Sequence, residues 1–104
     1  MNGPQFWYLK SKVLAESAAW DYLKAMPVKD RFELVSINPG LVLGPSFVGA
    51  GFTSGEFITG IMEGTKKYLP PNNVVDVRDV AKAHLMAIKK EAAAGRRFVL
   101  VNQV

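Results

Sequence analysis

Tyr8 and Lys12 are the two residues whose types and spacing could do chemistry, and they lie in the stretch "FWYLKSK", residues 6–12. On an α-helix, residues four apart point the same way, so Tyr8 and Lys12 would share a face while Lys10 would point nearly opposite. A phenol is a poor proton donor or acceptor at neutral pH, but an ammonium group within about 4–6 Å favours its phenolate form. Such a pair could exchange a proton with a substrate. The alternative is a chance spacing on a solvent-exposed helix.

The helix that would carry this pair is predicted over residues 8–25. This stretch contains no Gly or Pro and many strong helix formers, and Pro27 follows it. The next element is "FELVSI", residues 32–37, a short apolar run with β-branched members that predicts a buried strand. Asn38-Pro39-Gly40 then predicts a turn, and residues 41–44 continue as extended chain.

The second half of the sequence predicts two more helices and two more strands. Thr53 and Glu56 have the spacing of a capping box, so a short helix should follow, ending near Gly64. We expect its buried face to carry four apolar residues: Phe57, Ile58, Ile61 and Met62. A strand is predicted over residues 74–77, a helix over 78–94 before Gly95, and a strand over 97–101, with loops at 45–51 and 65–73.

Helices and strands therefore alternate, which favours an α/β fold with a mostly parallel sheet. Three short strands make a thin sheet, and parallel sheets normally need helices on both faces. The length of 104 residues allows one small domain. The helix with Tyr8 begins so early that we expect residues 1–104 to form a single partial domain, the C-terminal part of something longer.

Composition narrows the classes of function. With 49% apolar and 21% charged residues the chain resembles ordinary globular proteins, and no apolar run is long enough to span a membrane. The net charge of +4 comes from scattered residues, so we expect no nucleic-acid partner. One histidine and no cysteine make a transition-metal site improbable. The lack of cysteine leaves the compartment open, and a cytoplasmic location is the default expectation.

Three segments together resemble one family. "YLKSKVLAE" followed by "AAW" resembles the catalytic helix of the extended short-chain dehydrogenase/reductase superfamily (NAD-dependent epimerase/dehydratase family), in its dihydroflavonol reductase-like and cinnamoyl-CoA reductase-like branch. "INPGLVLGP" resembles the segment after the next strand in that branch, and "VVDVRDVAKAH" resembles a later strand-to-helix motif. Their common order is much more specific than any one of them.

The resemblance implies a Rossmann-like, doubly wound parallel sheet and roles for particular residues. Tyr8 would be the general acid that protonates a substrate carbonyl oxygen, and Lys12 would tune Tyr8 and bind the nicotinamide ribose. Ser54 would approach the cofactor's phosphates at a helix start, where free N–H groups attract an anion, although it could equally serve only as a helix cap. The segment implied to line the nicotinamide comprises Pro39, Gly40, Leu41 and Val42.

The parts of this family that read the nucleotide are not in the sequence. The Gly-rich turn between the first strand and helix is absent, and so is the residue that reads the ribose 2′ position. We therefore expect a fragment that lacks the N-terminal nucleotide-binding half and part of the small substrate-binding region. The 104-residue chain alone should be inactive, and its exposed sheet edge and apolar surface should promote self-association.

The resemblance favours NADP(H) over NAD(H) as the cofactor of the parent protein, which would be an oxidoreductase acting on a small-molecule carbonyl or alcohol. Two alternatives stay open. A nucleotide-sugar epimerase or dehydratase of the same superfamily uses the same Tyr-Lys pair, and a truncated relic could act only as an interaction module. The versions "NPGLVLGP" and "VDVRDVAKAH" look more like the reductases than the epimerases.

Asp79 and His84 are predicted to be structural. Asp79 lies where it can stabilise a helix start, and His84 shares a helical face with Val80 and Ile88, which predicts a partly buried, hydrogen-bonded histidine. The aromatic residues of the first helix, Trp7, Trp20 and Tyr22, are most simply explained by packing.

Overall fold

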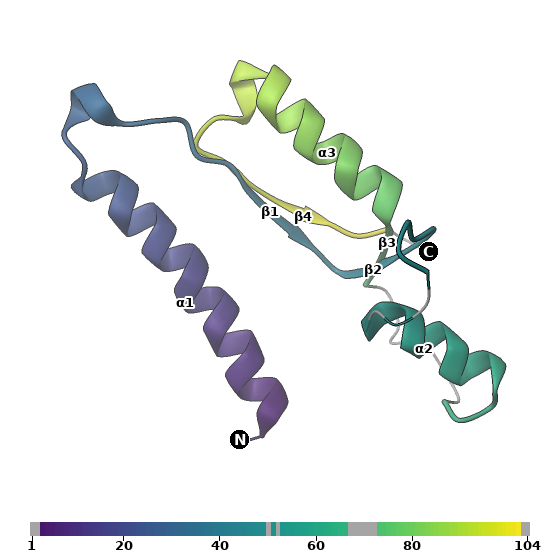
Figure 1. Ribbon diagram of the computed structural model, residues 1–104. Helices are drawn as coiled ribbons and strands as arrows, with labels where there is room; N and C mark the ends of the chain where they lie inside the picture. Colours follow the sequence, from purple (N-terminus) through teal and green to yellow (C-terminus); the bar gives the residue numbers. More distant parts are fainter. Residues whose placement is uncertain (1–2, 50, 52, 67–72, 103–104) are drawn as a thin grey trace.

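The computed structural model describes residues 3–49, 51, 53–66 and 73–102. In chain order the elements are α1 (Pro4–Ala25), β1 (Ser36–Pro39), β2 (Leu41–Leu43), α2 (Thr53–Met62), β3 (Val74–Asp76), α3 (Val77–Lys89) and β4 (Arg97–Leu100), with 3-10 turns at Val28–Asp30 and Glu91–Ala93 (Figure 1). Helices alternate with parallel strands, so the α/β class is confirmed. Of the predicted loops, Ala50 and residues 67–72 lie outside the described residues.

The strands form two parallel pairs that meet at Gly40. β1 pairs with β4, with Ser36 opposite Arg97, and β2 pairs with β3, with Leu41 opposite Val74. The N–H groups of Ser36 and Gly40 donate to the carbonyls of Arg96 and Leu100, each over 3.0 Å. The next N–H along the chain, that of Leu41, donates instead to the carbonyl of Asn73.

The predicted strand over residues 32–37 and the predicted turn at Asn38-Pro39-Gly40 are wrong in position. The strand begins at Ser36 and includes Asn38 and Pro39. Ser36 and Gly40 both donate to β4, so by alternation the nitrogen of Pro39 points away from β4, where no donor is needed. The segment is therefore an almost continuous strand interrupted only at Gly40, and four short strands replace the expected three.

Helix α1 starts four residues earlier than the predicted helix. Pro4 occupies the first turn, where a missing N–H costs nothing because that group has no helical partner. The other end of α1 is closed by Arg31, whose guanidinium donates to the carbonyls of Lys24 (2.7 Å) and Met26 (3.0 Å). The carbonyl of Lys24 belongs to the last turn and that of Met26 to the C-cap residue, and a helix leaves carbonyls at this end without partners.

Helix α3 begins and ends earlier than predicted. Asp76 caps it by accepting a hydrogen bond from the N–H of Arg78 over 2.8 Å, so Val77 is helical and the strand before it ends at Asp76. The predicted helix over residues 78–94 breaks at Lys90, after which Glu91–Ala93 form a 3-10 turn and Gly95 adopts a φ of 71°. Helix α2 ends at Met62, and Gly64 follows with a φ of 73°, as its predicted role at the helix end requires.

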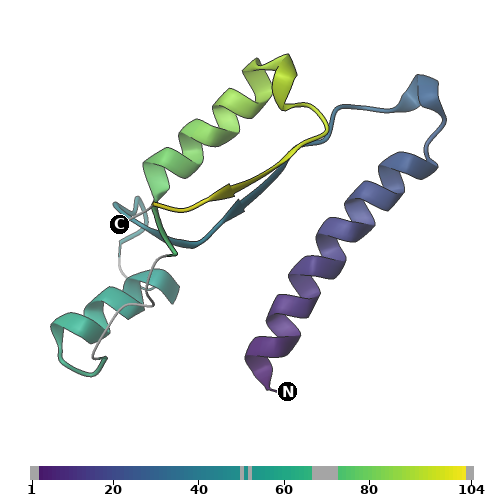
Figure 2. The same ribbon diagram turned by 180° about the vertical axis from the view of Figure 1, so that it is seen from behind.

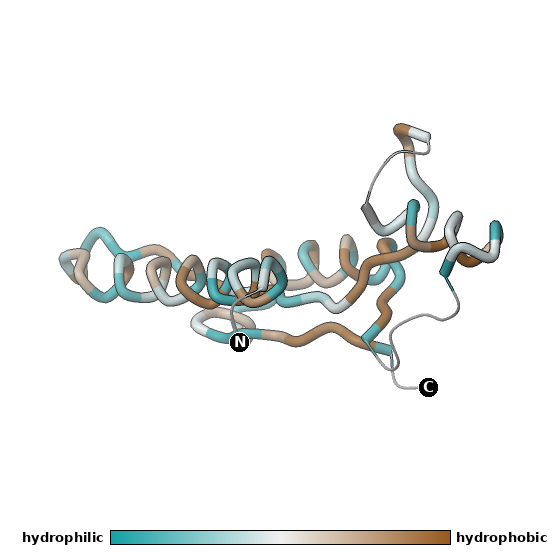
Figure 3. Tube along the Cα trace, turned by 90° about the horizontal axis from the view of Figure 1, so that it is seen from below, coloured by the Kyte–Doolittle hydropathy of each residue, from teal (hydrophilic) through white to brown (hydrophobic). Residues whose placement is uncertain are grey.

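The molecule is open, with little interior. Its radius of gyration is 16.9 Å, compared with about 13 Å for a compact domain of this length. Figures 1 and 2 show α1 running along the strands with a wide separation from α3, and Figure 3 shows apolar residues in brown along extended stretches and around the helices. Among the described hydrophobic residues only Val75 and Ala93 are buried. Most apolar surface that a folded domain would hide is therefore exposed.

Candidate active site

The Tyr8–Lys12 pair has the geometry that its spacing predicts. Both residues lie in the first half of α1, and the Lys12 ammonium nitrogen lies 5.5 Å from the centroid of the Tyr8 ring. Tyr8 is 60% exposed. Within the part of the chain that the structure describes, Lys12 enters no salt bridge. A phenol and an ammonium group are thus presented together on an accessible helix face.

The direction of α1 brings this pair toward the carboxyl ends of the strands. Figures 1 and 2 show α1 roughly antiparallel to β1, so that the start of α1 lies on the side where β1 and β2 end. The carboxyl ends of strands are where open parallel sheets bind ligands. The side that holds the Tyr8 end of α1 is therefore the side expected for a ligand.

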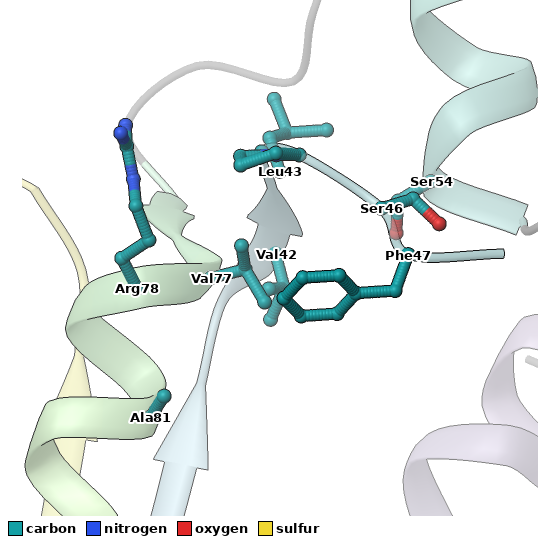
Figure 4. A pocket seen from close by; sticks show the side chains of 10 residues that line it. Val42, Leu43, Ser46, Phe47, Ser54, Val77, Arg78 and Ala81 are labelled. Atoms are coloured by element: carbon teal, nitrogen blue, oxygen red, sulfur yellow. The ribbon is translucent and has the colours of Figure 1, made fainter. Parts of the chain in front are cut away.

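An open cavity of about 570 Å³ lies at the carboxyl ends of β2 and β3. Its walls come from the end of β2, the loop after it, and the starts of α2 and α3: Val42, Leu43, Gly44, Pro45, Ser46, Phe47, Ser54, Val77, Arg78 and Ala81. In Figure 4 the Phe47 ring points toward Val42 and Val77, and Ser46 and Ser54 lie on the opposite side from Arg78. The lining is mainly apolar with a few polar groups, as in many small-molecule sites.

The structure brings together only some of the predicted site residues. Val42 and Ser54 line the same cavity. Pro39 is the last residue of β1, Leu41 is the first residue of β2, and Gly40 joins the two strands. None of these three residues lines the cavity. Tyr8 and Lys12 lie on α1 and are not among its lining residues either. Ser54 is half-buried at the start of α2, whereas the side chain of Thr53 lies outside the described part.

Asp76 and Arg78 form an ion pair at the rim of the cavity. The Arg78 guanidinium donates to both Asp76 carboxylate oxygens, over 2.9 and 2.6 Å. Side-chain hydrogen bonds from Arg78, followed by its backbone N–H, lower the pKa of Asp76 from 3.8 to about 2. Asp76 therefore accepts hydrogen bonds from the first turn of α3 and from the Arg78 guanidinium. The ion pair holds the Arg78 side chain beside the cavity and balances its charge.

The prediction for His84 is wrong about its burial and right about its hydrogen bond. His84 and Ile88 are exposed, because α3 turns its Ala83 and Ala87 side toward the strands. The Nδ1 atom of His84 lies 2.8 Å from the carbonyl oxygen of Val80 in its own helix. In the predicted apolar face of α2, Phe57 and Ile61 are half-buried but Met62 is 83% exposed.

The sequence did not indicate several residues that cap a helix, join two elements or line the cavity. Asp76 and Asp79 have the spacing of an acidic helix start, which could have identified the cap of α3. Glu16 follows Lys12 by four residues and could have been added to the same helix face, but nothing in the sequence indicates its partner, Arg97, on β4. Phe47 lines the cavity from a loop, where no periodic pattern exists.

Two further findings concern the described residues alone. No described helix is both long enough and apolar enough to cross a bilayer. No cluster of three or more His, Asp or Glu side chains in the described ranges could hold a metal ion.

Comparison with known proteins identifies relatives of this chain. No family model matches it. It is 38% identical over 97 residues to cinnamoyl-CoA reductase CAD2 of Medicago truncatula, covering 90% of this chain and 28% of that protein. It is 36% identical over 101 residues to NADPH-dependent methylglyoxal reductase GRE2 of Saccharomyces cerevisiae, covering 89% of this chain and 30% of the relative.

The fold is also found among solved structures. Gre2 from Candida albicans superposes with a TM-score of 0.81 at 37% identity, covering 97% of this chain and 32% of that one. The parallel α/β arrangement thus corresponds to a part of a reductase. The chain spans about 30% of the length of the curated relatives it matches.

The relatives named for an activity are reductases, and the similarity to Gre2 extends to the α/β fold. These similarities agree with the extended short-chain dehydrogenase/reductase superfamily, in the dihydroflavonol reductase-like branch with its cinnamoyl-CoA reductases and Gre2-like enzymes. The resemblance carried by the three sequence segments is confirmed.

Proposed function

We propose that this chain carries the proton-transfer part of an NADP(H)-dependent oxidoreductase that reduces a small carbonyl compound, or oxidises the corresponding alcohol. The observation that carries the proposal is the Tyr8–Lys12 pair, with an ammonium nitrogen 5.5 Å from the phenol ring on an exposed helix face. The relatives named for their activity are reductases, which favours this reaction over that of an epimerase or dehydratase.

The residues present suit the nicotinamide end of such a cofactor. Lys12 offers ammonium donors for ribose hydroxyls, and the backbone from Pro39 to Val42 follows the carboxyl end of β1, the kind of position at which open parallel sheets bind ligands. Ser54 would meet a phosphate at the start of α2. When bound, the reduced nicotinamide supplies a hydride to the carbonyl carbon. NADP(H) is preferred to NAD(H) because two relatives are named for NADPH dependence.

The work of this chain is the movement of one proton. As negative charge develops on the carbonyl oxygen, the Tyr8 hydroxyl gives its proton to that oxygen, and the Lys12 ammonium stabilises the phenolate that is left. In the direction of alcohol oxidation the phenolate takes the proton back.

A cytoplasmic location also stays a prediction, which cell fractionation would test.

A chimera tests the function directly. This chain replaces the aligned segment of Saccharomyces cerevisiae NADPH-dependent methylglyoxal reductase GRE2, and NADPH oxidation is measured with methylglyoxal and a panel of aldehydes and ketones. We expect activity, and we expect Tyr8→Phe to lower kcat by about 10²–10⁴ because positioned proton transfer contributes that much. Tyr22→Phe is the matched control, since Tyr22 lies on the same helix with a similar exposure of 64%.

Two results would overturn the proposal. One is a chimera that folds, as judged by circular dichroism and cooperative melting, but reduces no carbonyl, which would favour the non-catalytic relic. The other is a Tyr8→Phe rate within about twofold of the parent, because the general acid would then lie elsewhere.

A further inference from the structure

Helix α1 is joined to the sheet by a bidentate ion pair. The Arg97 guanidinium donates from Nε to Oε1 of Glu16 over 2.9 Å and from Nη2 to Oε2 over 3.1 Å, although the two residues are 81 positions apart in sequence. Two parallel N–H···O bonds fix direction as well as distance. The Trp20 indole N–H donates to the same Oε1 over 3.3 Å, one helical turn further on. The Glu16 side chain is thereby held between α1 and β4.

The environment of Glu16 keeps it ionised. Hydrogen bonds from Arg97, then from Trp20, and a smaller one from the Ser36 hydroxyl lower the pKa of Glu16 from 4.5 to about 2. Since the pKa in the folded chain is below the ordinary value, the stabilisation is present above about pH 4.5 and is lost as pH falls through about 2. At neutral pH both members of the Glu16–Arg97 pair, called the anchor below, are therefore charged.

The anchor point lies at the start of the strand that leads to the proposed cofactor segment. Arg97 is the first residue of β4 and lies opposite Ser36, the first residue of β1. From Ser36 to Gly40 the strand advances by about 13 Å, at about 3.3 Å per residue. From Glu16 back to Tyr8 the helix advances by about 12 Å, at 1.5 Å per residue. Because α1 and β1 run roughly antiparallel, both advances go the same way (Figures 1 and 2).

The anchor therefore sets Tyr8 level with Gly40 along the sheet. Tyr8, Lys12 and Glu16 follow one another at four-residue spacing, so all three lie on one side of α1. A tilt of the helix by about 10° around Glu16 would displace Tyr8 by about 2 Å, given the 12 Å lever. A misplacement of about 1 Å is enough to cost a reaction roughly 10²-fold.

Little else in the described chain fixes α1. The contacts between elements are concentrated among the strands, α2 and α3, and Arg31 closes only the helix's own last turn. Asp21 and Lys24 form a pair within the helix, 3.9 Å apart and exposed. Among the salt bridges of the described residues, Glu16–Arg97 alone joins α1 to another element.

We propose that Glu16 and Arg97 are positioning residues, which hold the helix of Tyr8 and Lys12 at the height of the Pro39–Gly40 segment. The proposal rests on the proposed function for its catalytic consequence, but not for its structural one. It requires that the pair act as a unit, so that loss of either member has the same effect and exchange of the two restores it.

The structural consequence is tested in the chain itself by a distance measurement. The sequence has no cysteine, so Lys10→Cys on α1 and Val99→Cys on β4 give two spin labels per chain, and dilution into an excess of unlabelled chain removes distances between copies. We expect a narrow distance distribution that broadens in both Glu16→Gln and Arg97→Gln and narrows again in the exchange Glu16→Arg with Arg97→Glu. Asp21→Asn, which removes another carboxylate of α1, should leave it unchanged.

A distribution that stays narrow in both single variants, or an exchange that restores nothing, would overturn the proposal. Arg97→Lys guards against unfolding, because it keeps the charge but gives up the bidentate geometry. It should broaden the distribution partly while helical circular dichroism is retained, and a distribution identical to that of the parent would also contradict the proposal.

The catalytic consequence is tested in the chimera. We expect Glu16→Gln and Arg97→Gln each to lower kcat by about 10- to 100-fold with little change in KM, and the exchange to recover most of the loss. A change in KM alone, or no recovery on exchange, would overturn it. If Tyr8→Phe proves harmless the proposed function fails, whereas the distance measurement still decides whether Glu16 and Arg97 hold the helix.

Discussion

The Lys12 ammonium nitrogen lies 5.5 Å from the centroid of the Tyr8 ring, and two residues earlier the Lys10 ammonium nitrogen lies 5.4 Å from the centroid of the Trp7 ring. The two contacts are alike in distance and lie on different sides of the same helix. Only the first places a cation beside a group that can exchange a proton. The Lys10–Trp7 contact is therefore a matched control for the role of the Lys12 ammonium beside Tyr8.

Lys12→Met in the chimera should lower kcat by about 10²-fold, since the phenolate formed on proton transfer loses its cation. Lys10→Met removes an equally placed ammonium from Trp7 and should leave kcat within about twofold. The measurement is NADPH oxidation at saturating carbonyl substrate. Equal losses in the two variants would mean that the helix only needs positive charge, and the assignment of Lys12 would fail.

Helix α1 could be predicted from local sequence, whereas the place of Pro39 in a strand could not. Helix formers and Pro27 identified α1 because a helix depends on neighbours in sequence, and its end at Ala25 was predicted. Pro39 was read as the sign of a turn, yet it lies in a strand because its nitrogen faces away from β4. Whether a proline is tolerated depends on which edge of the strand is paired, and a partner 61 residues away is not visible in local sequence.

In the candidate site, too, features set by neighbours in sequence were predicted and features set by distant partners were not. Tyr8 and Lys12 were predicted because four-residue spacing is a local property of a helix. The cavity beside Phe47 and the Glu16–Arg97 pair depend on elements far apart in sequence, so periodicity could not indicate them. His84 was expected to be partly buried because it shares a face with Val80, but the strands pack against the neighbouring face of α3 instead.

Gly40→Ala should destabilise the fold where the two pairs of strands meet. A Cβ atom at Gly40 would collide with the backbone carbonyl of Asn73 and lie 3.2 Å from Cγ1 of Val101. The backbone cannot move aside without breaking the hydrogen bond from Leu41 to Asn73, so we expect a loss of about 1–3 kcal/mol.

The measurement is urea unfolding of the chimera. Gly3→Ala is the control, since a Cβ atom there meets nothing within 4 Å, although its position before α1 allows a small loss of its own. A Gly40→Ala midpoint equal to that of Gly3→Ala would show that the approach of Asn73 to Gly40 is not close in solution.

Asp76→Asn should remove a pH dependence from stability. Arg78 donates to Asp76 through its guanidinium and its backbone N–H, whereas the charge of Asp79 acts on Arg78, whose pKa it raises. These hydrogen bonds lower the pKa of Asp76 from 3.8 to about 2, so its stabilisation is present above about pH 4 and disappears as pH falls toward 2.

The parent should therefore lose its advantage over Asp76→Asn between about pH 4 and pH 2, as followed by the thermal unfolding of the chimera. Asp79→Asn removes a carboxylate from the same helical turn without removing the cap. The difference in unfolding temperature between the parent and Asp79→Asn should therefore change less between pH 4 and pH 2 than the difference between the parent and Asp76→Asn. A constant difference between parent and Asp76→Asn over this pH range would contradict the role of the ionised carboxylate.

The chain by itself should self-associate, with a second copy covering its apolar surface. Only Val75 and Ala93 are buried among the described hydrophobic residues, while Val13 on α1 is 68% exposed and Val99 on β4 is 62% exposed. Soluble monomers seldom expose so much contiguous apolar surface. We expect sedimentation velocity at micromolar concentration to show dimers or larger species that persist in high salt, because apolar contacts are not screened.

Val13→Glu places a charge in this surface and should shift the population toward monomer, whereas Ser11→Glu adds the same charge two residues away, on nearly the opposite side of α1, and should not. If both variants dissociate the assembly equally, association depends on charge and not on buried apolar area. A chain that is monomeric at every concentration, with a radius of gyration near 16.9 Å, would contradict the prediction, because the apolar surface would then stay exposed without driving association.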